Sequence, residues 1–484
     1  MPTLRPNPTL PSFMSLELPV SFQTRMQTQL GEAYPAFAEA LAQPSPTSVR
    51  VNQAKMPLPT TLLAVPWTQT GFYLSARPSF TLDPMFHGGA YYVQEASSMF
   101  LEQALRQSVD LSQPLAVLDL CGAPGGKSTH IASLLSEDSL LVANEVIKPR
   151  ANILAENIQK WGSGNVVVTN NDPSHIGALT GFFDVMVVDA PCSGEGMFRK
   201  DPDAMNEWSE ANVKLCSERQ RRILMDVWEA LKPGGVLIYS TCTYNLEENE
   251  ENLAWLARQQ DAEAITLQLQ PDWGVTQTKL EGMHGYRFYP HQTQGEGFFL
   301  AAVGKTDGEE ARTFKKSKRP YLVPASKQEK ALVQDWLKEP KSWELVKHKE
   351  VLRALPANWM LELEQLYENL RVVYGGIEVA EVMKNNAKPL PALALSQHLS
   401  PDAFPLGEVD LATALKFLHR EDISLENSAN GWVLVSFQGV PLGWGKKLQN
   451  RVNNHYPKEW RIRMSLDEAL KPENLANLFT LGNQ

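Results

Sequence analysis

Two cysteines lie in short segments that bring sulfur next to acidic and hydroxyl side chains. Asp189 and Cys192 are three residues apart in VVDAPCSGEGM (187–197), and Cys242 follows fifty residues later in YSTCTYN (239–245). Each segment ends an apolar run, so we expect both cysteines at the ends of buried strands. A single cysteine in either place is more often a small core residue. Two of them beside an aspartate favour covalent chemistry through a thiolate.

Methylation of carbon 5 of cytosine needs such a set, because this carbon is a poor nucleophile. A thiolate that adds to carbon 6 moves electron density to carbon 5, which can then attack an electrophilic methyl group. An acid that protonates or hydrogen-bonds N3 of the ring favours the addition, and a base must later remove the carbon-5 proton so that the thiol is eliminated. The residue types alone do not decide whether Cys192 or Cys242 attacks.

A glycine-rich turn, VLDLCGAPGGKST (117–129), joins an apolar run to a helical segment. A phosphate-binding loop of the form G-x-x-x-x-G-K-[ST] requires glycine five residues before Gly126, but Cys121 stands there. The dinucleotide-binding pattern G-x-G-x-x-G is absent. An ATPase with Asp189 as its magnesium-binding acid stays open as an alternative. S-adenosylmethionine, which has no phosphate to neutralise, suits the turn better.

Acidic residues end three successive apolar runs, in an order that suits S-adenosylmethionine. Asp119 suits the ammonium group, Glu145 suits the two ribose hydroxyls, and Asp172 suits the amino group of adenine. Backbone N–H groups of the glycine-rich turn suit the carboxylate of the methionine part. The alternative is that these acids cap helices, as acidic side chains often do. Three acids in this order favour cofactor binding.

Residues 111–305 alternate short apolar runs with longer amphipathic segments. We expect a helix over about 209–232 and strands over 114–121, 139–145, 165–172, 182–190 and 234–242. This alternation predicts an α/β, Rossmann-like fold, with a parallel sheet covered by helices on both faces. Ligands of such sheets bind at the carboxyl ends of the strands. Six residues lie at those predicted ends: Cys121, Glu145, Asp172, Asp189, Cys192 and Cys242.

The formal net charge of −10 by itself argues against a nucleic-acid partner, but the basic residues are concentrated. RTFKKSKR (312–319) has five and no acid, and the segment 441–463 has six against one acid. The second segment also holds three aromatic residues that could stack on bases, Trp444, Tyr456 and Trp460. The acids gather instead in NLEENEE (245–251) and on other segments that we expect to be helical surfaces. A solvated face and RNA binding are equal alternatives for the basic runs.

The four cysteines form no C-x-x-C pair and the nine histidines are scattered, so we expect neither a disulfide framework nor a metal site. Cys216, on an amphipathic segment, is expected in the core. Prolines break the first twenty residues, which argues against a signal peptide. No apolar run approaches the ~20 residues of a membrane span. These observations predict a cytoplasmic protein with no membrane partner.

Four segments carry a resemblance to a known family: DLCGAPGGKST, DAPCSGEGMFRKDPD, STCTYNLEENE and GEGFFLAAV. In order and spacing they resemble the RNA (cytosine-5)-methyltransferase family, which includes the eukaryotic NOL/NOP2/Sun proteins. The resemblance covers about residues 15–305, and FHGGAYYVQEASSM (86–99) is similar to the family's entry to the cofactor domain. It implies S-adenosyl-L-methionine as the cofactor and RNA as the substrate.

The resemblance also implies a role for each matching residue. Cys242 in TCT matches the nucleophile, and Cys192 in PCSG matches an assisting cysteine that helps to release the product. Asp189 matches the residue that contacts N3 and lies close to the cofactor. The matching cofactor contacts are Cys121, Gly122, Ala123, Pro124, Gly125, Gly126, Lys127, Glu145, Arg150, Asp172 and Asp189. Cys121 departs from the family pattern, which has alanine or another small residue at this position.

With this resemblance the chain is expected to have four parts. They are an N-terminal RNA-binding extension (1–110), a methyltransferase domain (111–308), a basic linker with a small middle domain (309–392), and a β-rich, PUA-like RNA-binding domain (393–484). A basic PUA-like module is typical of bacterial members that act on 16S ribosomal RNA, and implies a target cytosine near the decoding site. We expect a monomer whose partner is ribosomal RNA, free or in the assembled 30S subunit.

Three alternatives stay open beside this hypothesis, in addition to the ATPase. DNA enzymes of this chemistry attack with the cysteine of PC and lack a second cysteine in TC, so Cys242 favours RNA. A transfer RNA cytosine-5 methyltransferase would carry the same site. An RNA-binding ribosome assembly factor with an inactive methyltransferase fold is a different class, and the intact Asp189, Cys192 and Cys242 argue against it.

Overall fold

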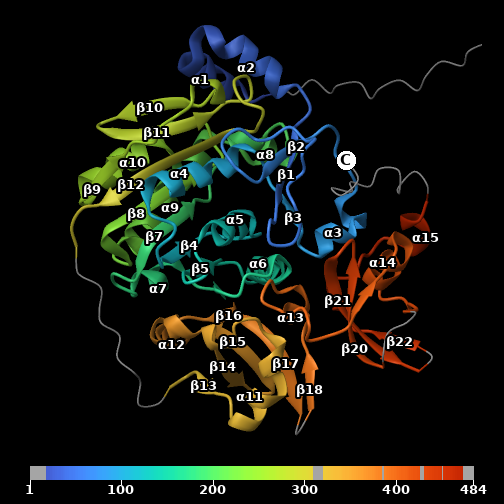
Figure 1. Ribbon diagram of the computed structural model, residues 1–484. Helices are drawn as coiled ribbons and strands as arrows, with labels where there is room; N and C mark the ends of the chain where they lie inside the picture. The colour runs from blue at the N-terminus through green and yellow to red at the C-terminus, as the bar shows by residue number, and fades with distance from the viewer. Residues whose placement is uncertain (1–17, 309–319, 384–385, 426–429, 450, 472–484) are drawn as a thin grey trace, which may run out of the picture.

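A large central sheet organises the molecule (Figure 1). The computed structural model describes residues 18–308, 320–383, 386–425, 430–449 and 451–471. Across the sheet the strand order is β10-β11-β12-β8-β7-β4-β5-β6-β16, and β9 pairs with β12. In chain order the strands are β4 (Ala116–Asp119), β5 (Leu140–Asn144), β6 (Val166–Thr169), β7 (Phe183–Asp189), β8 (Leu231–Thr241), β9 (Ala262–Ile265), β10 (Thr276–Leu280), β11 (Met283–Phe288), β12 (Phe298–Lys305) and β16 (Val372–Gly375).

The five central strands, β8-β7-β4-β5-β6, are all parallel, as the alternating pattern predicts. Successive residues of β4 point to opposite faces, so Val117 belongs to one apolar core and Leu118 to the other. The helices that cover the first face are α4 (Leu101–Ser108), α5 (Gly126–Leu134) and α6 (Lys148–Trp161). The helices that cover the second are α9 (Glu210–Trp228), α10 (Glu250–Gln259) and α12 (Met360–Asn369). The predicted α/β, Rossmann-like fold is confirmed.

Two details differ from the expected strands and helices. The helix expected over 209–232 is α9, which ends at Trp228 because β8 already begins at Leu231. Antiparallel strands extend the sheet on both sides, with β12 beside β8 and β16 beside β6. The chain therefore returns to the central sheet with β16, more than sixty residues after β12.

The N-terminal region has two parts that contact the central domain at different places. The helices α1 (Val20–Leu30) and α2 (Tyr34–Leu41) pack over the loops that follow β7 and β8. Their shared core holds Phe22, Met26, Phe37, Leu41, Phe198, Trp208, Val213, Tyr244 and Tyr289. A three-stranded sheet follows, with β2 (Gly71–Leu74), β1 (Thr47–Val51) and β3 (Tyr91–Val93) side by side. The N-terminal helices thus cover the edge at which the parallel strands end.

The middle segment forms a sheet of its own. Its strands, in spatial order, are β13 (Val323–Pro324), β14 (Trp343–His348), β15 (Val351–Pro356), β17 (Ile377–Met383) and β18 (Asn386–Pro389). Between β15 and β17 the chain supplies α12 and β16 to the central domain. The basic run 312–319 lies outside the described residues.

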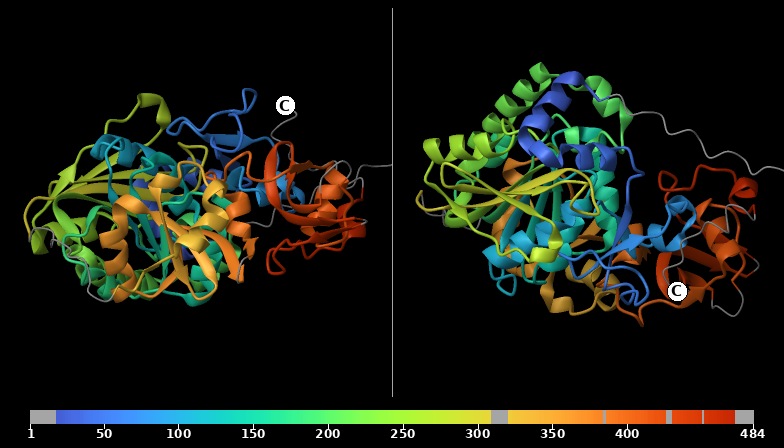
Figure 2. Two further views of the ribbon diagram at one scale, coloured as in Figure 1. Left: turned by 60° about the horizontal axis from the view of Figure 1, so that its bottom comes forward. Right: turned by 90° about the horizontal axis from the view of Figure 1, so that it is seen from above.

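The C-terminal segment is a small β-rich unit that contacts the N-terminal sheet (Figure 2). Its strands are β19 (Leu406–Glu408), β20 (Gly431–Phe437), β21 (Val440–Leu448) and β22 (Arg451–Asn454), with α14 (Leu411–Leu418) beside them. Val49 and Tyr91 of the N-terminal sheet share one apolar core with Leu415, Phe417 and Val433. Among the helices of the described ranges, none has the length and apolar character that a membrane span requires.

Candidate active site

The two thiols meet at the carboxyl ends of β7 and β8. These strands are parallel neighbours in which Asp189 lies opposite Ser240, so the loops that follow them emerge side by side. Cys192 Sγ lies 2.9 Å from Cys242 Sγ, and the backbone N–H of Cys242 donates to Cys192 Sγ at 3.3 Å. Both cysteines are partly exposed and free. The predicted pairing of the two segments is therefore present as a contact between sulfur atoms.

The two sulfur atoms differ in their surroundings. The hydrogen bond with Cys242 and burial together raise the pKa of the Cys192 thiol well above its usual value, and the nearby Glu248 carboxylate adds to the rise. Cys192 therefore holds its proton at neutral pH, and its S–H lies where it can donate to the Cys242 sulfur. A donor at this distance stabilises negative charge on Cys242. The contact with Cys242 and burial therefore both favour the protonated form of Cys192.

Asp189 ends β7 with both carboxylate oxygens engaged. Lys127 Nζ lies 2.9 Å from Oδ2, and the Ser240 hydroxyl donates to Oδ1 at 2.8 Å. Burial alone would lower the pKa of the Lys127 ammonium, but Asp189 reverses this effect and the pKa is raised. Lys127 also lies 5.2 Å from the centre of the Phe298 ring. The charged Lys127 thus joins the glycine-rich turn to the strand that precedes Cys192.

The glycine-rich turn folds closely over Asp119. A Cβ atom added to Gly122 would lie 2.7 Å from Ser128 Oγ and 3.2 Å from an Asp119 carboxylate oxygen, so no larger residue fits there. Gly125 has φ of 122° and precedes α5, a conformation that favours glycine. Ala123, Pro124 and Gly126 complete the turn, with the Ala123 carbonyl accepting from Arg150 Nη2 at 2.9 Å.

Asp119 is buried, and one of its carboxylate oxygens has no partner among the described residues. Oδ2 accepts from the Ser128 hydroxyl at 2.6 Å, whereas Oδ1 accepts no hydrogen bond within the part of the chain that the structure describes. Burial raises the pKa of Asp119 to about 7, against the lowering effect of Ser128. A buried acceptor without a donor is costly unless a ligand supplies one. The ammonium group of S-adenosylmethionine fits this requirement.

Glu145 follows β5 and is also buried, at 3% exposure. Its Oε1 accepts from the backbone N–H of Ile147 at 2.8 Å, and Arg150 Nη1 lies 3.4 Å from its Oε2. Arg150 thus contacts both Glu145 and the Ala123 carbonyl, which links the end of β5 to the glycine-rich turn. A carboxylate held in this way can accept from the two hydroxyls of a ribose.

Asp172 lies at the end of β6, where the cofactor hypothesis predicts it. It also caps a helix, which is the alternative role for these acids. It follows β6 and is the N-cap of the short helix α7 (Pro173–Gly177), where its Oδ1 accepts from the backbone N–H of Ser174 at 3.1 Å. Hydrogen bonds from Ser174 lower the pKa of Asp172. Its contact with adenine stays a prediction.

Three family models match successive parts of the chain. The model described as 16S rRNA methyltransferase RsmB/F matches residues 107–304. The N-terminal domain of 16S rRNA methyltransferase RsmF matches 18–96, and the methyltransferase RsmF PUA domain matches 405–462. The ribosomal RNA small subunit methyltransferase F of Vibrio vulnificus strain YJ016 is 33% identical over 464 residues, which cover 91% of this chain and 97% of that protein. The chain belongs to the RsmB/F methyltransferase family.

A second curated relative and two solved structures are also similar to this chain. The ribosomal RNA small subunit methyltransferase F of Cronobacter sakazakii is 32% identical, over 92% of this chain and 97% of its own. A crystal structure of a methyltransferase homolog protein from Pyrococcus horikoshii has a TM-score of 0.51 and 30% identity, and covers 61% of this chain and 100% of its own. NSun6 from the same organism, solved with SFG, has the same TM-score at 21% identity, over 60% of this chain and 99% of its own, and shows the shared fold.

Cys121 is where this chain differs from the expected RsmB/F pattern. Its sulfur lies beside the glycine-rich turn, packed against the second apolar core. Burial, together with the charges of Asp119, Asp189 and Glu145, raises the pKa of the Cys121 thiol far above its usual value. Cys121 therefore stays protonated and does not compete with the two thiols as a nucleophile. Cys216 is buried on α9, as expected.

The segment NLEENEE (245–251) was expected on a helical surface, and this expectation is wrong for two of its acids. Glu248 is 0% exposed and Glu250 is 2% exposed. Glu250 pairs with Arg287, whereas Glu248 accepts hydrogen bonds from the residues around Cys192. Most of their partners come from distant parts of the chain, among them Ser193, Gln220 and Arg287, and the local sequence did not indicate their burial.

Another carboxylate that sequence reasoning missed, Glu195, joins the loops of the two cysteines. Glu195 accepts from the backbone N–H of Tyr244 at 2.9 Å and from Trp208 Nε1 at 3.0 Å, and it pairs with Arg25 of α1. The backbone N–H of Gly196 also donates to the carbonyl of Cys242 at 2.9 Å. The N-terminal helices therefore hold the loops of both cysteines together.

Two aromatic residues of the basic C-terminal segment are not available for stacking. Trp444 and Tyr456 are each 1% exposed, and Trp444 Nε1 donates to the Leu390 carbonyl at 2.8 Å. The interpretation of these rings as stacking platforms is wrong, because Trp444 on β21 and Tyr456 after β22 are each buried in an apolar core. Trp460 is only partly buried, and Lys160 Nζ lies 5.3 Å from its ring centre.

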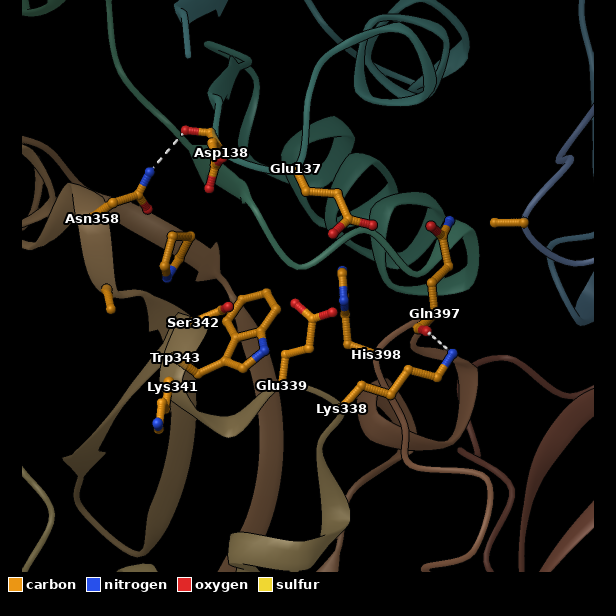
Figure 3. Close-up of a pocket in the computed structure, with 13 residues that line it drawn as sticks. Glu137, Asp138, Lys338, Glu339, Lys341, Ser342, Trp343, Asn358, Gln397 and His398 are labelled. Carbon is orange, nitrogen blue, oxygen red and sulfur yellow. Dashed lines mark hydrogen bonds between the residues drawn. The ribbon is translucent and has the colours of Figure 1, made fainter. Parts of the chain in front are cut away.

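A cavity of about 500 Å³ lies away from the thiols, between the central domain and the middle segment (Figure 3). Glu137 and Asp138, from the turn before β5, line one side, and Glu339 and Trp343 line the other. Asn358 Nδ2 donates to the Asp138 carbonyl at 2.9 Å across this junction. The turn is at the amino end of β5, so the cavity is on the opposite edge of the sheet from the candidate active site.

Proposed function

We propose that this protein transfers a methyl group from S-adenosyl-L-methionine to carbon 5 of a cytosine in small-subunit ribosomal RNA. The observation that carries the proposal is the contact between the Cys192 and Cys242 sulfur atoms, next to an aspartate at the end of the same strand pair. The names of the relatives support the substrate class, since they describe ribosomal RNA small subunit methyltransferases. The proposed target is a cytosine near the decoding site. The proposed location of the protein is the cytoplasm.

Cys242 is the proposed nucleophile. Its thiolate adds to carbon 6 of the cytosine, which breaks the C5–C6 double bond and places the electron pair on carbon 5. The S–H of Cys192 lies where it can stabilise the Cys242 thiolate before this addition. When the carbon-5 proton is later removed, the double bond re-forms and the C6–S bond breaks. Cys192 is then in place to donate a hydrogen bond to the departing sulfur, which is the release role that the resemblance implies.

Asp189 is the proposed contact to N3 of the ring, where a hydrogen bond or a proton lets the ring accept the electron pair. Lys127 and Ser240 fix the orientation of its carboxylate. Lys127 belongs to the cofactor turn, and Ser240 lies two residues before Cys242. Asp189 is therefore held between the cofactor turn and the proposed nucleophile. In this proposal, Asp189 at the end of β7 activates the ring and Cys242 after the adjacent strand β8 attacks it.

S-adenosylmethionine, when bound, supplies an electrophilic methyl group. Asp119 would hold its ammonium, Glu145 its ribose hydroxyls, and the turn 121–127 its methionine carboxylate through backbone N–H groups. Asp172 would contact the adenine amino group through the carboxylate oxygen that does not cap α7. These acids and this turn lie at the carboxyl ends of β4, β5 and β6, next to the thiols at the ends of β7 and β8.

The testing experiment is bisulfite sequencing of total RNA from cells with and without this protein, because 5-methylcytosine resists deamination. The expected result is loss of protection at one cytosine of 16S ribosomal RNA. In vitro methylation of naked 16S RNA and of 30S subunits then identifies the substrate form. Protection lost only in transfer RNA would replace the substrate by the transfer RNA alternative. Unchanged protection in all RNA would leave the inactive assembly factor as the better hypothesis.

A further inference from the structure

We propose that Glu248 is a positioning residue that sets the separation of the two reacting thiols. The proposal goes beyond the residue roles inferred above and rests on the proposed function for its catalytic meaning. Glu248 lies in the turn before α10 and touches neither cysteine through a hydrogen bond. It acts instead on the residues next to each of them.

On the Cys192 side, Glu248 holds the chain both before and after the cysteine. The backbone N–H of Ser193 donates to Oε2 at 3.0 Å, and the Ser193 hydroxyl donates to Oε1. Gln220 Nε2 donates to Oε2 at 2.7 Å and to the carbonyl of Pro191 at 3.0 Å. The residues on either side of Cys192 are therefore fixed to one carboxylate.

On the Cys242 side, the same carboxylate acts through Asn245. Asn245 Nδ2 donates to Glu248 Oε1 at 2.7 Å and to Thr243 Oγ1 at 2.8 Å, and the Asn245 side-chain oxygen accepts from the backbone N–H of Glu248 at 2.8 Å. The hydroxyls of Ser193 and Thr243 are 3.1 Å apart. A continuous set of buried hydrogen bonds therefore runs from the residue after Cys192 to the residue after Cys242.

Burial makes this arrangement sensitive to the identity of residue 248. Ser193, Gln220, Thr243, Asn245 and Glu248 are each at most 6% exposed, so water cannot replace a missing partner. Glu248 accepts from four neutral donor groups, and only a carboxylate presents acceptors alone at both oxygen positions. A glutamine of the same shape would turn its NH₂ toward at least one of these donors. The loops of the two cysteines would then have to separate.

The experiment compares Glu248→Gln with Glu247→Gln, the same change one residue earlier. The side chain of Glu247 forms no hydrogen bond with any residue that the structure describes. The readout is the rate at which diamide, which takes two electrons and two protons from a thiol pair, joins Cys192 to Cys242 as a disulfide. Peptide mass spectrometry identifies the pair, and no RNA or methyl donor is needed, so this readout is independent of the proposed function.

We expect Glu248→Gln to slow the formation of this disulfide at least about tenfold, and Glu247→Gln to leave the rate unchanged. In methylation of 16S RNA, Glu248→Gln should lower kcat about 10- to 100-fold with KM for RNA changed less than threefold. The Kd for S-adenosylmethionine should stay within twofold, because Asp119 and Glu145 are on other strands.

Disulfide formation at the control rate in Glu248→Gln would overturn the proposal. If Glu248→Gln does not bind cofactor and is therefore misfolded, Ser193→Ala replaces it, since this change removes one donor and keeps the backbone N–H. A disulfide rate unchanged in Ser193→Ala would likewise overturn the proposal. Wild-type protein that forms the disulfide rapidly but methylates no RNA would overturn the proposed function and leave the positioning result standing.

Discussion

The sulfur atoms of Cys192 and Cys242 lie 2.9 Å apart, and the backbone N–H of Cys242 points at the sulfur of Cys192. At this distance each thiol is part of the environment of the other. Removing either one therefore changes the reaction in a different way, and the two single variants give opposite expected results.

Replacing Cys242 by Ala should abolish methyl transfer, because carbon 6 of cytosine then has no nucleophile. We expect methylation of 16S RNA to fall about 10³-fold or more, with the Kd for S-adenosylmethionine unchanged in calorimetry. Cys216→Ala, a change of the same chemistry on α9, is the matched control. Turnover retained in Cys242→Ala would remove Cys242 from the role of nucleophile.

Replacing Cys192 by Ala should let Cys242 attack and then slow the release of RNA. The expected product is a protein–RNA adduct that survives denaturing electrophoresis and is absent in the double variant with Cys242→Ala. An adduct that instead forms in Cys242→Ala, with Cys192→Ala inert, would exchange the roles of the two thiols.

Binding of S-adenosylmethionine should weaken as the pH falls below about 7. Burial raises the pKa of Asp119 to about 7 in the free protein, and only the ionised carboxylate attracts the ammonium group. The Kd should therefore rise up to about tenfold per pH unit below this value and be constant above about pH 8. Calorimetry from pH 5.5 to 8.5 measures the effect. Asp119→Asn should bind weakly at every pH, and a pH dependence that persists in it belongs to another group.

The raised pKa of Asp119 also affects the stability of the cofactor-free protein. Here a rise in pH is unfavourable, whereas it favours cofactor binding. The usual pKa of an aspartate is 3.8, so between about pH 4 and 7 the folded state holds a proton that the unfolded state has released. The contribution of Asp119 to the free energy of unfolding is therefore present at low pH and decreases as the pH rises through this window. Urea unfolding of wild type and Asp119→Asn at pH 5 and pH 8 separates this contribution.

Trp444→Ala should act on folding and not on base stacking. Its indole is 1% exposed in the core and donates to the Leu390 carbonyl, so truncation should lower the free energy of unfolding by about 3–5 kcal/mol. Trp460→Ala, at a partly buried position, should cost less. Urea denaturation followed by circular dichroism measures both effects, and equal values would contradict the different burial.

The basic residues of the same segment should act on RNA through charge. Lys447 Nζ is engaged with the Leu425 carbonyl at 2.6 Å, which leaves Lys446 and the exposed Arg451 as the better phosphate ligands. Changing both to Gln should weaken binding and reduce the slope of log K against log salt by about 0.7 to 0.9 for each phosphate that is no longer neutralised. Lys349→Gln in the middle segment is the control. An unchanged slope in the double variant would assign this face a structural role.

Periodic apolar runs predicted the five parallel strands, and the acids and cysteines at their ends predicted where the site lies. These features are local in the sequence, and the parallel topology brings all the carboxyl ends to one edge. The pairing of β16 with β6 was not predictable in this way, because two hundred residues separate the strands and pairing depends on the three-dimensional packing.

The two wrong predictions, for Glu248 and Trp444, also depend on contacts in the three-dimensional packing. Glu248 was expected on the surface because it is an acid among acids, but the donors of Ser193, Gln220 and Asn245 make its burial favourable. Trp444 was interpreted as a stacking ring because lysines surround it, but its strand places it toward Phe404 and the Leu390 carbonyl. In both places a distant partner decides the environment.

The apolar core shared by the N-terminal sheet and the C-terminal unit has a consequence for synthesis of the chain. Val49 and Tyr91 leave the ribosome early, whereas Leu415 and Phe417 follow roughly 320 residues later, about 16–64 s at 5–20 residues per second. Until then the nascent N-terminal sheet keeps an apolar face uncovered. A segment that is translated late thus covers the apolar face of one translated early, and a nascent chain that stops before residue 411 would present that face to chaperones.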